Sequence, residues 1–278
     1  MGVLMLRKTT SIICGAFSLL MMVFGPAFGG PYAPAAQESG SSALYMDEPA
    51  FISWAVAVAG YTPGDKVDPT WQTPQKALGK AEGNSFDVVS LGEGGTITLL
   101  FDPPIENGTG WDFAVFENSF SDFYLELAFV EVSSNGVDFV RFDSGSLTSQ
   151  PVTGFGNLDP TNVDGLAGKY RQGFGTPFDL EALADKATVV RGAVDLSAIT
   201  HVRIVDITGD GSCLDSREAP IYDPYPTTGS AGFDLDAVGV LRDAPMPEEE
   251  YVPPTPPAEN GEAGFGDAGG CFVHSLWQ

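Results

Sequence analysis

The sequence feature that most constrains the fold is the stretch from Gly94 to Phe142, where strand-like runs follow one another with a turn signal after each. In the first run, Ile97, Leu99 and Phe101 alternate with threonine, which is the period of a half-buried strand. A Pro-Pro pair follows this run, and proline cannot donate a hydrogen bond to a sheet ladder. Short strands at this density predict two stacked antiparallel sheets.

The same pattern extends along the chain. Later strand-like runs of this stretch cover residues 111–116, 125–133 and 137–142, with a hairpin turn at 134–136, and others cover 87–91, 187–191, 200–207 and 233–241. We expect two short helices, one opening at Asp47 with Phe51, Ala55 and Val58 on one face, and one opening at Thr176. Residues 143–176 and 208–232 show little periodicity. The sequence therefore predicts an all-β antiparallel sandwich with two short helices and long loops.

Composition divides the 278-residue chain into five expected parts. Residues 1–29 have the features of a signal peptide, because Arg7 and Lys8 precede an uncharged apolar run and a small-x-small cleavage cue ends at Gly29. We expect a flexible leader at 30–44, the sandwich at 45–243, a Pro/Glu/Gly-rich linker at 244–270 and a tail at 271–278. These features predict a protein of the bacterial cell surface or extracellular space, with no transmembrane span in the mature chain.

The net charge of the chain is −24, from 13 Lys+Arg against 37 Asp+Glu. Such an acidic protein is a poor partner for nucleic acid, whose phosphates require cations. Only Cys213 and Cys271 lie beyond the predicted signal peptide, so the fold depends on its apolar core and not on a disulfide framework. Whether these two cysteines pair is left open.

Enzymatic activity is not expected. The chain has two histidines, and no serine lies in a nucleophile-elbow context near His201. Zinc and phosphate-binding motifs are absent from the sequence. Paired carboxylates can hydrolyse glycosides, and Glu117, Glu126 and Glu131 are the candidates for this weaker alternative. Glu126 and Glu131 have opposite parity along one run and would project from opposite faces.

Calcium is the cofactor that the acidic loops suggest, because hard cations take carboxylate, amide and carbonyl oxygens. Acids interrupt apolar runs at several predicted strand ends, where they are paired, metal-bound or at a rim. The candidate metal ligands are Glu117, Asn118, Asp206, Asp210, Asp234 and Asp236. The alternative is that these acids close turns through hydrogen bonds.

Aromatic residues in the predicted loops suggest a ligand. Rings beside acidic and basic side chains suit the apolar faces and hydroxyl groups of a sugar. The candidates are Phe123, Tyr124, Tyr170, Arg171, Tyr222 and Tyr225. The alternative is that such rings pin long loops to the body of the domain.

Three runs together resemble the discoidin-like, galactose-binding-like jelly roll. They are VEVSSNGVDFVRF at 130–142, ITHVRIVDI at 199–207 and FDLDAVGV at 233–240. A longer string, from the double-glycine strand at Gly94 through DFAVFEN at 112–118 to GFDLDAVGV at 232–240, also resembles bacterial cell-surface proteins with C-terminal sorting signals. Gly-Gly-Cys-Phe-Val at 269–273 resembles the opening of such a signal. The resemblance implies a jelly-roll sandwich that binds sugars or other small ligands at one end, with attachment to the cell envelope through the tail.

Taken together, these observations predict a secreted or cell-surface binding module for a glycan or other small ligand, with calcium stabilising its loops. A structural or adhesive protein that contacts other proteins is the alternative, and a glycoside hydrolase using carboxylates is the weaker one.

Overall fold

The computed structural model describes residues 29–246. The chain divides into two compact units, Met1–Pro247 and Glu248–Gln278, and the description concerns the first. Most of the predicted signal peptide, most of the linker and the whole tail lie outside the described residues, as does Cys271. Among the residues described, no helix is both long and apolar enough to cross a bilayer.

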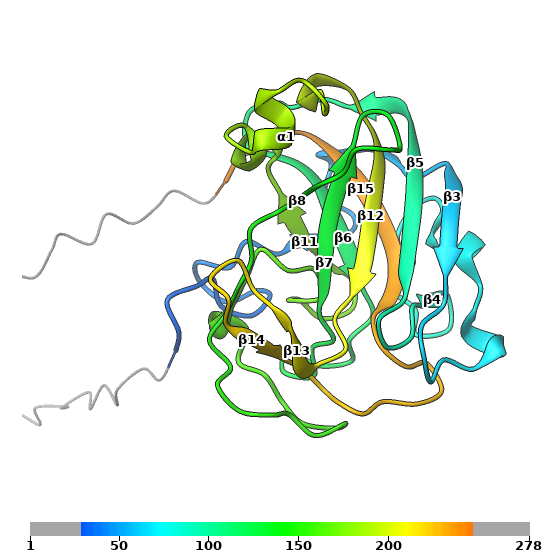
Figure 1. Cartoon of the computed structure of the whole chain (residues 1–278), viewed down its shortest axis with the longest axis vertical. Helices are drawn as coiled ribbons and strands as arrows, with labels where there is room; N and C mark the ends of the chain where they lie inside the picture. Colours follow the sequence, from blue (N-terminus) through cyan, green and yellow to red (C-terminus); the bar gives the residue numbers. More distant parts are fainter. Residues whose placement is uncertain (1–28, 247–278) are drawn as a thin grey trace, which may run out of the picture. The chain divides into compact units, whose positions relative to one another are not determined.

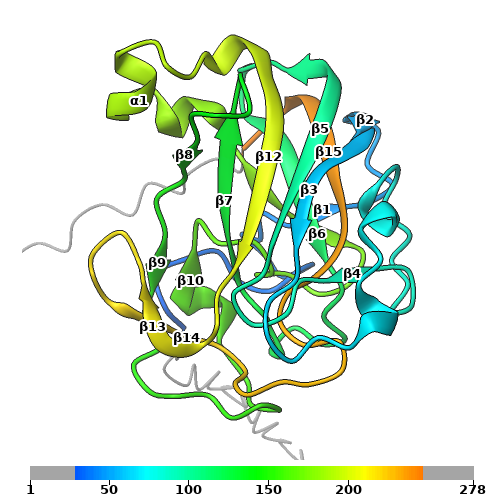
Figure 2. The ribbon, with the colours of Figure 1, turned by 45° about the vertical axis from the view of Figure 1, so that its right-hand side comes forward.

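Two antiparallel sheets form the body of the domain, which confirms the predicted all-β sandwich (Figures 1 and 2). The first sheet has the order β1 (Leu44–Tyr45), β11 (Phe174–Phe178), β6 (Trp111–Glu117), β15 (Asp234–Ala244) and β2 (Phe51–Trp54), and β4 (Val89–Ser90) also pairs with β15. The second has the order β3 (Ala57–Thr62), β5 (Thr96–Ile105), β12 (Ile199–Asp206), β7 (Ala128–Ser133) and β8 (Val140–Arg141).

The long loops contain smaller elements. Two short hairpin-like pairs lie there, β9 (Gly145–Ser146) with β10 (Val163–Asp164) and β13 (Asp210–Leu214) with β14 (Pro220–Tyr222). The helical segments are α1 (Ala187–Val190) and the 3-10 turns η1 (Pro69–Trp71), η2 (Pro74–Ala77), η3 (Pro160–Asn162), η4 (Leu180–Leu183) and η5 (Leu196–Ala198).

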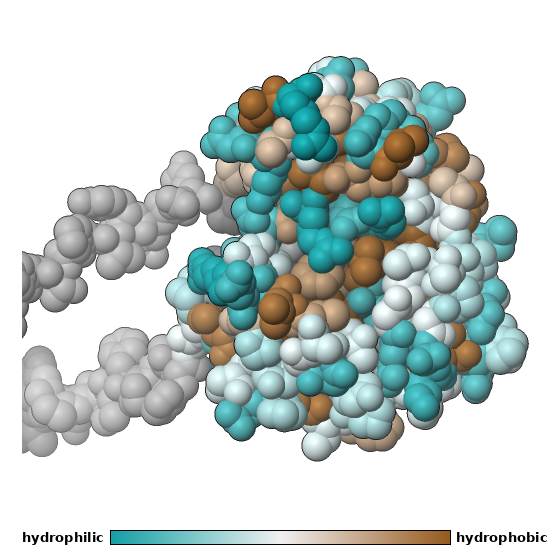
Figure 3. All heavy atoms as spheres, viewed as in Figure 1, coloured by the Kyte–Doolittle hydropathy of each residue, from teal (hydrophilic) through white to brown (hydrophobic). Residues whose placement is uncertain are grey.

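The alternation in β5 places its apolar side chains in the core between the sheets. Ile97 and Leu99 are fully buried there, together with Val202 and Ile204 from the neighbouring β12. β6 is buried on both faces, because Phe113 contributes to this core while Phe116 packs in a second cluster with Phe51 and Trp54 of the same sheet's outer face. A strand covered on both sides carries even its terminal residue, Glu117, out of solvent. On the face of the molecule that Figure 3 shows, hydrophilic residues cover much of the surface and hydrophobic residues are exposed between them.

Three local predictions were wrong. Residues 51–58 form no helix; they belong to β2 and β3, which pair with β15 and β5 at the sheet edges. Residues 187–190 form α1 instead of a strand. The helix expected to open at Thr176 starts later, since Thr176 lies in β11 and Asp179 caps η4 through the N–H of Glu181. In each case the secondary structure was decided by whether a neighbouring strand was available for pairing, and not by the local sequence pattern.

Residues 30–44, predicted as a flexible leader, pack on the domain. Ala36 is buried with Tyr170 and Phe174, and the Tyr170 hydroxyl shares a hydrogen bond of 2.8 Å with the Ser42 hydroxyl. The small side chains that suggested flexibility are also those that fit closely against a neighbouring ring. This contact corrects the sequence-based expectation.

Candidate functional site

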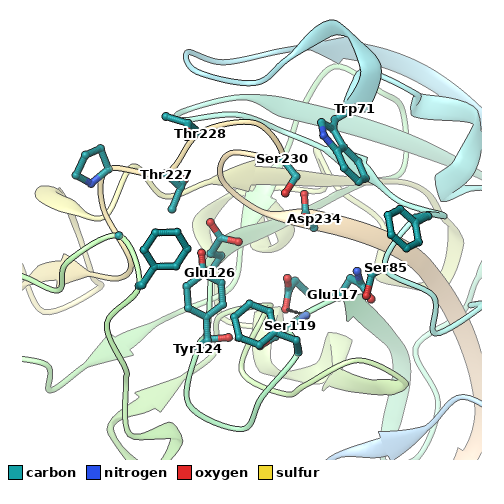
Figure 4. A pocket seen from close by; sticks show the side chains of 16 residues that line it. Trp71, Ser85, Glu117, Ser119, Tyr124, Glu126, Thr227, Thr228, Ser230 and Asp234 are labelled. Carbon is teal, nitrogen blue, oxygen red and sulfur yellow. Dashed lines mark hydrogen bonds between the residues drawn. The ribbon is translucent and has the colours of Figure 1, made fainter.

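A cavity of about 320 Å³ lies at the end of the sandwich where β6 stops and β15 starts (Figure 4). This volume is at the lower end of the range for small-molecule sites, about 300–1,000 Å³. We call it the end pocket. Its lining comes from five segments: Trp71, Ser85 and Phe86; Glu117 to Phe120 with Tyr124 and Glu126; Gly154 and Phe155; Pro226 to Thr228 with Ser230; and Asp234.

Three carboxyl groups from different elements turn toward the end pocket, as Figure 4 shows. Glu117 ends β6, and its strand partner Leu235 directly follows Asp234, the first residue of β15. Glu126 lies two residues before β7, which starts at the same end of the sandwich. Antiparallel pairing thus brings together acids that are far apart in the sequence.

The hydrogen bonds of these acids are incomplete. Glu117 Oε2 accepts from the N–H of Ser119 at 2.8 Å, and Asp234 accepts from the Ser90 hydroxyl. Among the described residues, Oε1 of Glu126 and Oδ1 of Asn118 are buried and accept from no donor. Buried acceptors without donors are costly and rare in folded proteins. The end pocket therefore offers oxygen acceptors to a ligand.

Burial raises the pKa of both Glu117 and Glu126 well above the usual range, and the negative charge of nearby Asp234 raises both further. Burial also raises the pKa of Asp234 to about 7, although the Ser90 hydroxyl favours its charged form. None of the ion pairs found within residues 29–246 includes any of the three. These three carboxyl groups form what we call the floor of the end pocket. Because no basic side chain in the described part of the chain pairs with them, bound protons or a ligand must balance their negative charge.

Aromatic rings form the walls and rim. Trp71 and Phe86 stack with ring centroids 6.4 Å apart, and Phe120 and Tyr124 stack at 4.6 Å. Phe155 is 91% exposed, Phe86 74% and Phe120 71%. Large exposed rings gathered around one cavity are typical of ligand or partner sites. They provide flat apolar faces directly above the acidic floor.

The structure separates the six predicted metal ligands. Glu117, Asn118 and Asp234 line the end pocket. Asp206 instead accepts from the N–H groups of Gly94 and Phe233, each at 2.7 Å, and so fastens two loops.

The other two candidates also serve the backbone. Asp236 accepts from the N–H groups of Glu82 at 3.0 Å and Gly83 at 2.8 Å, and the exposed Asp210 accepts from Ser212 N at 2.8 Å. In this structure Asp206, Asp210 and Asp236 thus accept backbone hydrogen bonds away from the end pocket, as the turn-closing alternative describes. Within residues 29–246, no three His, Cys, Asp or Glu side chains are grouped closely enough to hold a metal ion.

Of the six predicted ligand residues, only Tyr124 lines the end pocket. Phe123 is half-exposed beside it, and its carbonyl accepts from Leu158 N at 2.7 Å. Tyr225 precedes the lining residue Pro226, and Tyr222 lies on β14.

Two further candidates have structural contacts elsewhere. Tyr170 is 1% exposed and packs against the 30–44 segment, as the alternative of loop-pinning rings describes. Arg171 forms an ion pair with Asp122 at 2.9 Å and lies 4.5 Å from the Phe174 ring centroid.

Sequence reasoning did not assign Trp71, Phe86 and Phe155 to a ligand site, and it considered Glu126 only for hydrolysis. A weak signal existed, since an aromatic residue recurs in each loop that reaches this end of the sandwich. Nothing in the sequence showed which loops would meet. Only strand order does so.

Comparison of the chain with protein-family models, with curated proteins and with solved structures finds no match. The resemblance to discoidin-like jelly rolls and to sorting signals thus stays a prediction. What the structure defines is a class: an antiparallel β-sandwich with an aromatic-walled, acid-floored pocket at one end.

Proposed function

We propose that the protein is a secreted or cell-surface, non-catalytic binding module that holds a sugar unit of a glycan in the end pocket. The observation that carries this proposal is the combination of stacked aromatic walls with buried oxygen acceptors that have no donor in the described residues. Both halves of the site are needed for a ligand that is apolar on one face and rich in hydroxyl groups at its edge.

Each half of the site suits one part of a sugar ring. The C–H face of the ring can pack on Trp71 or Phe120, as apolar ligand faces do on aromatic side chains. The hydroxyl groups can donate to Glu126, Asn118 and Asp234 at the floor. Hydroxyl groups of Thr227 and Ser230, on the side of the pocket away from Tyr124 in Figure 4, add polar contacts.

Secretion and envelope attachment belong to the proposal through the sequence alone. The basic, then apolar start of the chain supports export, and the glycine–cysteine–phenylalanine run at 269–272 supports attachment. Both segments lie outside the described residues. Cell fractionation of the native host tests this part separately.

Calcium remains part of the proposal with a reduced set of ligands. Because no three acidic side chains group closely enough within residues 29–246, an ion at this floor would need amide, carbonyl and ligand oxygens as well. A melting curve with and without chelator tests it. A ligand that binds only the folded state must raise its stability, so an unchanged midpoint would reject calcium.

A glycan array with the full mature chain tests the main proposal. Trp71→Ala and Phe120→Ala should each lower affinity for the bound glycan about five- to thirtyfold, since stacking of this kind contributes on the order of 1–2 kcal/mol. Tyr222→Ala is the matched control, because it removes a ring outside the end pocket. Equal losses in all three variants, or binding to no glycan, would count against the proposal.

A glycoside hydrolase is the second candidate, because Glu117 and Glu126 line one cavity and both have a raised pKa. Hydrolysis requires one carboxyl to stay ionised while the other is protonated. All three acids here shift upward, with no cation paired to any of them in the described chain, so the binding proposal is favoured. Polysaccharide turnover that Glu117→Gln abolishes would reverse this order.

The adhesive alternative predicts a different use of the rim. Exposed Phe155 and Phe86 would then contact another protein directly, and the acidic floor would contribute nothing. Partner binding that survives Glu126→Gln but not Phe155→Ala would support adhesion over glycan binding.

A further inference from the structure

The floor of the end pocket has an unusual electrostatic balance. Glu117 and Glu126 are 2% and 5% exposed, and the charged groups that act most strongly on them are other acids. Asp234 comes first for both, followed by Asp223 for Glu117 and by Glu117 for Glu126. Asp223 is itself buried, and in the described part of the chain its carboxyl group accepts a hydrogen bond from the N–H of Leu127. A neutral sugar can supply hydrogen-bond donors to such a floor, but it cannot supply positive charge.

The basic side chains near the pocket are engaged elsewhere. Lys76 pairs with Asp87 at 3.7 Å and also donates to the Phe86 carbonyl. Arg171 pairs with Asp122. Lys169 is buried and donates to the Val163 carbonyl at 2.7 Å. Within residues 29–246, no ion pair therefore supplies a positive charge to the floor, and apart from protons such a charge has to come with the ligand.

From this arrangement we propose that the end pocket selects a ligand bearing a primary ammonium group on a sugar ring, that is, an amino sugar with a free amine. The inference deepens the proposed function and depends on it. It rests on the uncompensated carboxyl groups together with two buried acceptors, Glu126 Oε1 and Asn118 Oδ1, that no described donor reaches.

An ammonium group fits the chemistry of this site in two ways. It brings three N–H donors and a positive charge, and the lining offers acceptors for them: Glu126 Oε1 and Asn118 Oδ1 accept from no described donor, and Asp234 accepts from the Ser90 hydroxyl. The stacked rings of Phe120 and Tyr124 also line the pocket, and aromatic faces attract cations. The sugar ring then remains free to pack on the Trp71 side.

The same carboxyl groups bind protons when no ligand is present, because burial and their neighbours raise the pKa of Glu117 and Glu126. An ammonium group entering the pocket favours the charged carboxylates and so displaces these protons. The acids that face this position are Glu117, Glu126 and Asp234 in the lining, with Asp223 behind them.

The test uses the mature chain at pH 6.5 and three β-1,4-linked tetrasaccharides that differ at one substituent, of glucosamine, N-acetylglucosamine and glucose. Calorimetry should show the glucosamine tetramer binding at least tenfold more tightly than the other two, with the preference weakening as salt is raised. Glu126→Gln should reduce the preference, and Tyr222→Ala should preserve it. The comparison of ligands on the unmodified protein does not depend on any variant folding.

Equal affinity for the three tetramers would overturn the amine inference and leave glycan binding intact. Tighter binding of the acetylated or the neutral sugar would also overturn it. Failure to bind any of the three would reject the inference for this sugar series, whereas the proposed function fails only if the glycan array is also blank.

Discussion

Glu126→Gln should make the stability of this protein less dependent on pH. Glu126 is buried, its Oε1 accepts no hydrogen bond from the described residues, and burial raises its pKa well above the usual range. The folded state thus keeps a proton that the unfolded chain releases above its pKa of about 4.3. The free energy of unfolding contributed by this group is present at low pH and is lost as the pH rises toward the folded-state pKa.

The size of the effect follows from the number of protons. One proton held only by the folded state lowers the free energy of unfolding by up to about 1.4 kcal/mol per pH unit, so the loss between pH 5 and pH 7 is up to about 2.7 kcal/mol. An amide does not titrate, so the slope for Glu126→Gln should be smaller by up to this amount. Glu117 and Asp234 retain a remaining slope in the variant.

Urea unfolding at pH 5, 6 and 7 measures both slopes, provided that the m values agree. The matched control is Glu106→Gln, which neutralises an exposed acid directly after the last residue of β5. Its free energy of unfolding should change with pH as that of the parent protein does. Parallel pH profiles for the parent and Glu126→Gln would refute the argument, because they would mean that Glu126 binds no extra proton in the folded state.

Three other substitutions test how the loops are fastened. Asp236→Ala should cost on the order of 2–4 kcal/mol in urea unfolding, because two backbone N–H groups lose their acceptor, and Asp236→Asn should cost less. Gly232→Ala should lower the free energy of unfolding more than Gly229→Ala, for which we expect a loss of about 1 kcal/mol. Both glycines have positive φ, but a Cβ at Gly232 would lie 2.7 Å from Asp206 Oδ1, whereas a Cβ at Gly229 meets nothing within 4 Å. Equal losses in the two variants would contradict this reasoning. Glu131→Gln should lower the free energy of unfolding by about 1–2 kcal/mol, since its carboxylate accepts from two partly exposed arginines of the second sheet; an unchanged thermal midpoint would show that the pairs contribute nothing.

The sequence alone was sufficient for the sandwich. Alternation at Ile97, Leu99 and Phe101 and again at Val202 and Ile204 requires one face of each strand to be buried, and all five side chains are buried in the core between the sheets. The hairpin turn after β7 was visible as well, with the Asn135 side chain accepting from the N–H of Val137 at 2.8 Å. Local pattern suffices here because period and turn chemistry are properties of neighbouring residues.

Tertiary structure decided the rest. Residues 51–58 have a pattern that also suits a helix, and only edges left open by β15 and β5 make them strands. Asp234 and Asp236 are two residues apart, yet one lines the end pocket and the other fastens a loop, because the ladder is irregular between Leu235 and Ala237. A bulge of this kind depends on the partner strand and leaves no signal in local composition.

The end pocket shows the same division. Its acids come from the end of β6, the loop between β6 and β7, and the start of β15. Its rings come from that same loop, which holds Phe120 and Tyr124, and from the segments that hold Trp71, Phe86 and Phe155. Each residue was visible in the sequence as an acid or a ring near a strand end. Which ends meet is set by strand order and register, and these are properties of long-range pairing that a single sequence does not display.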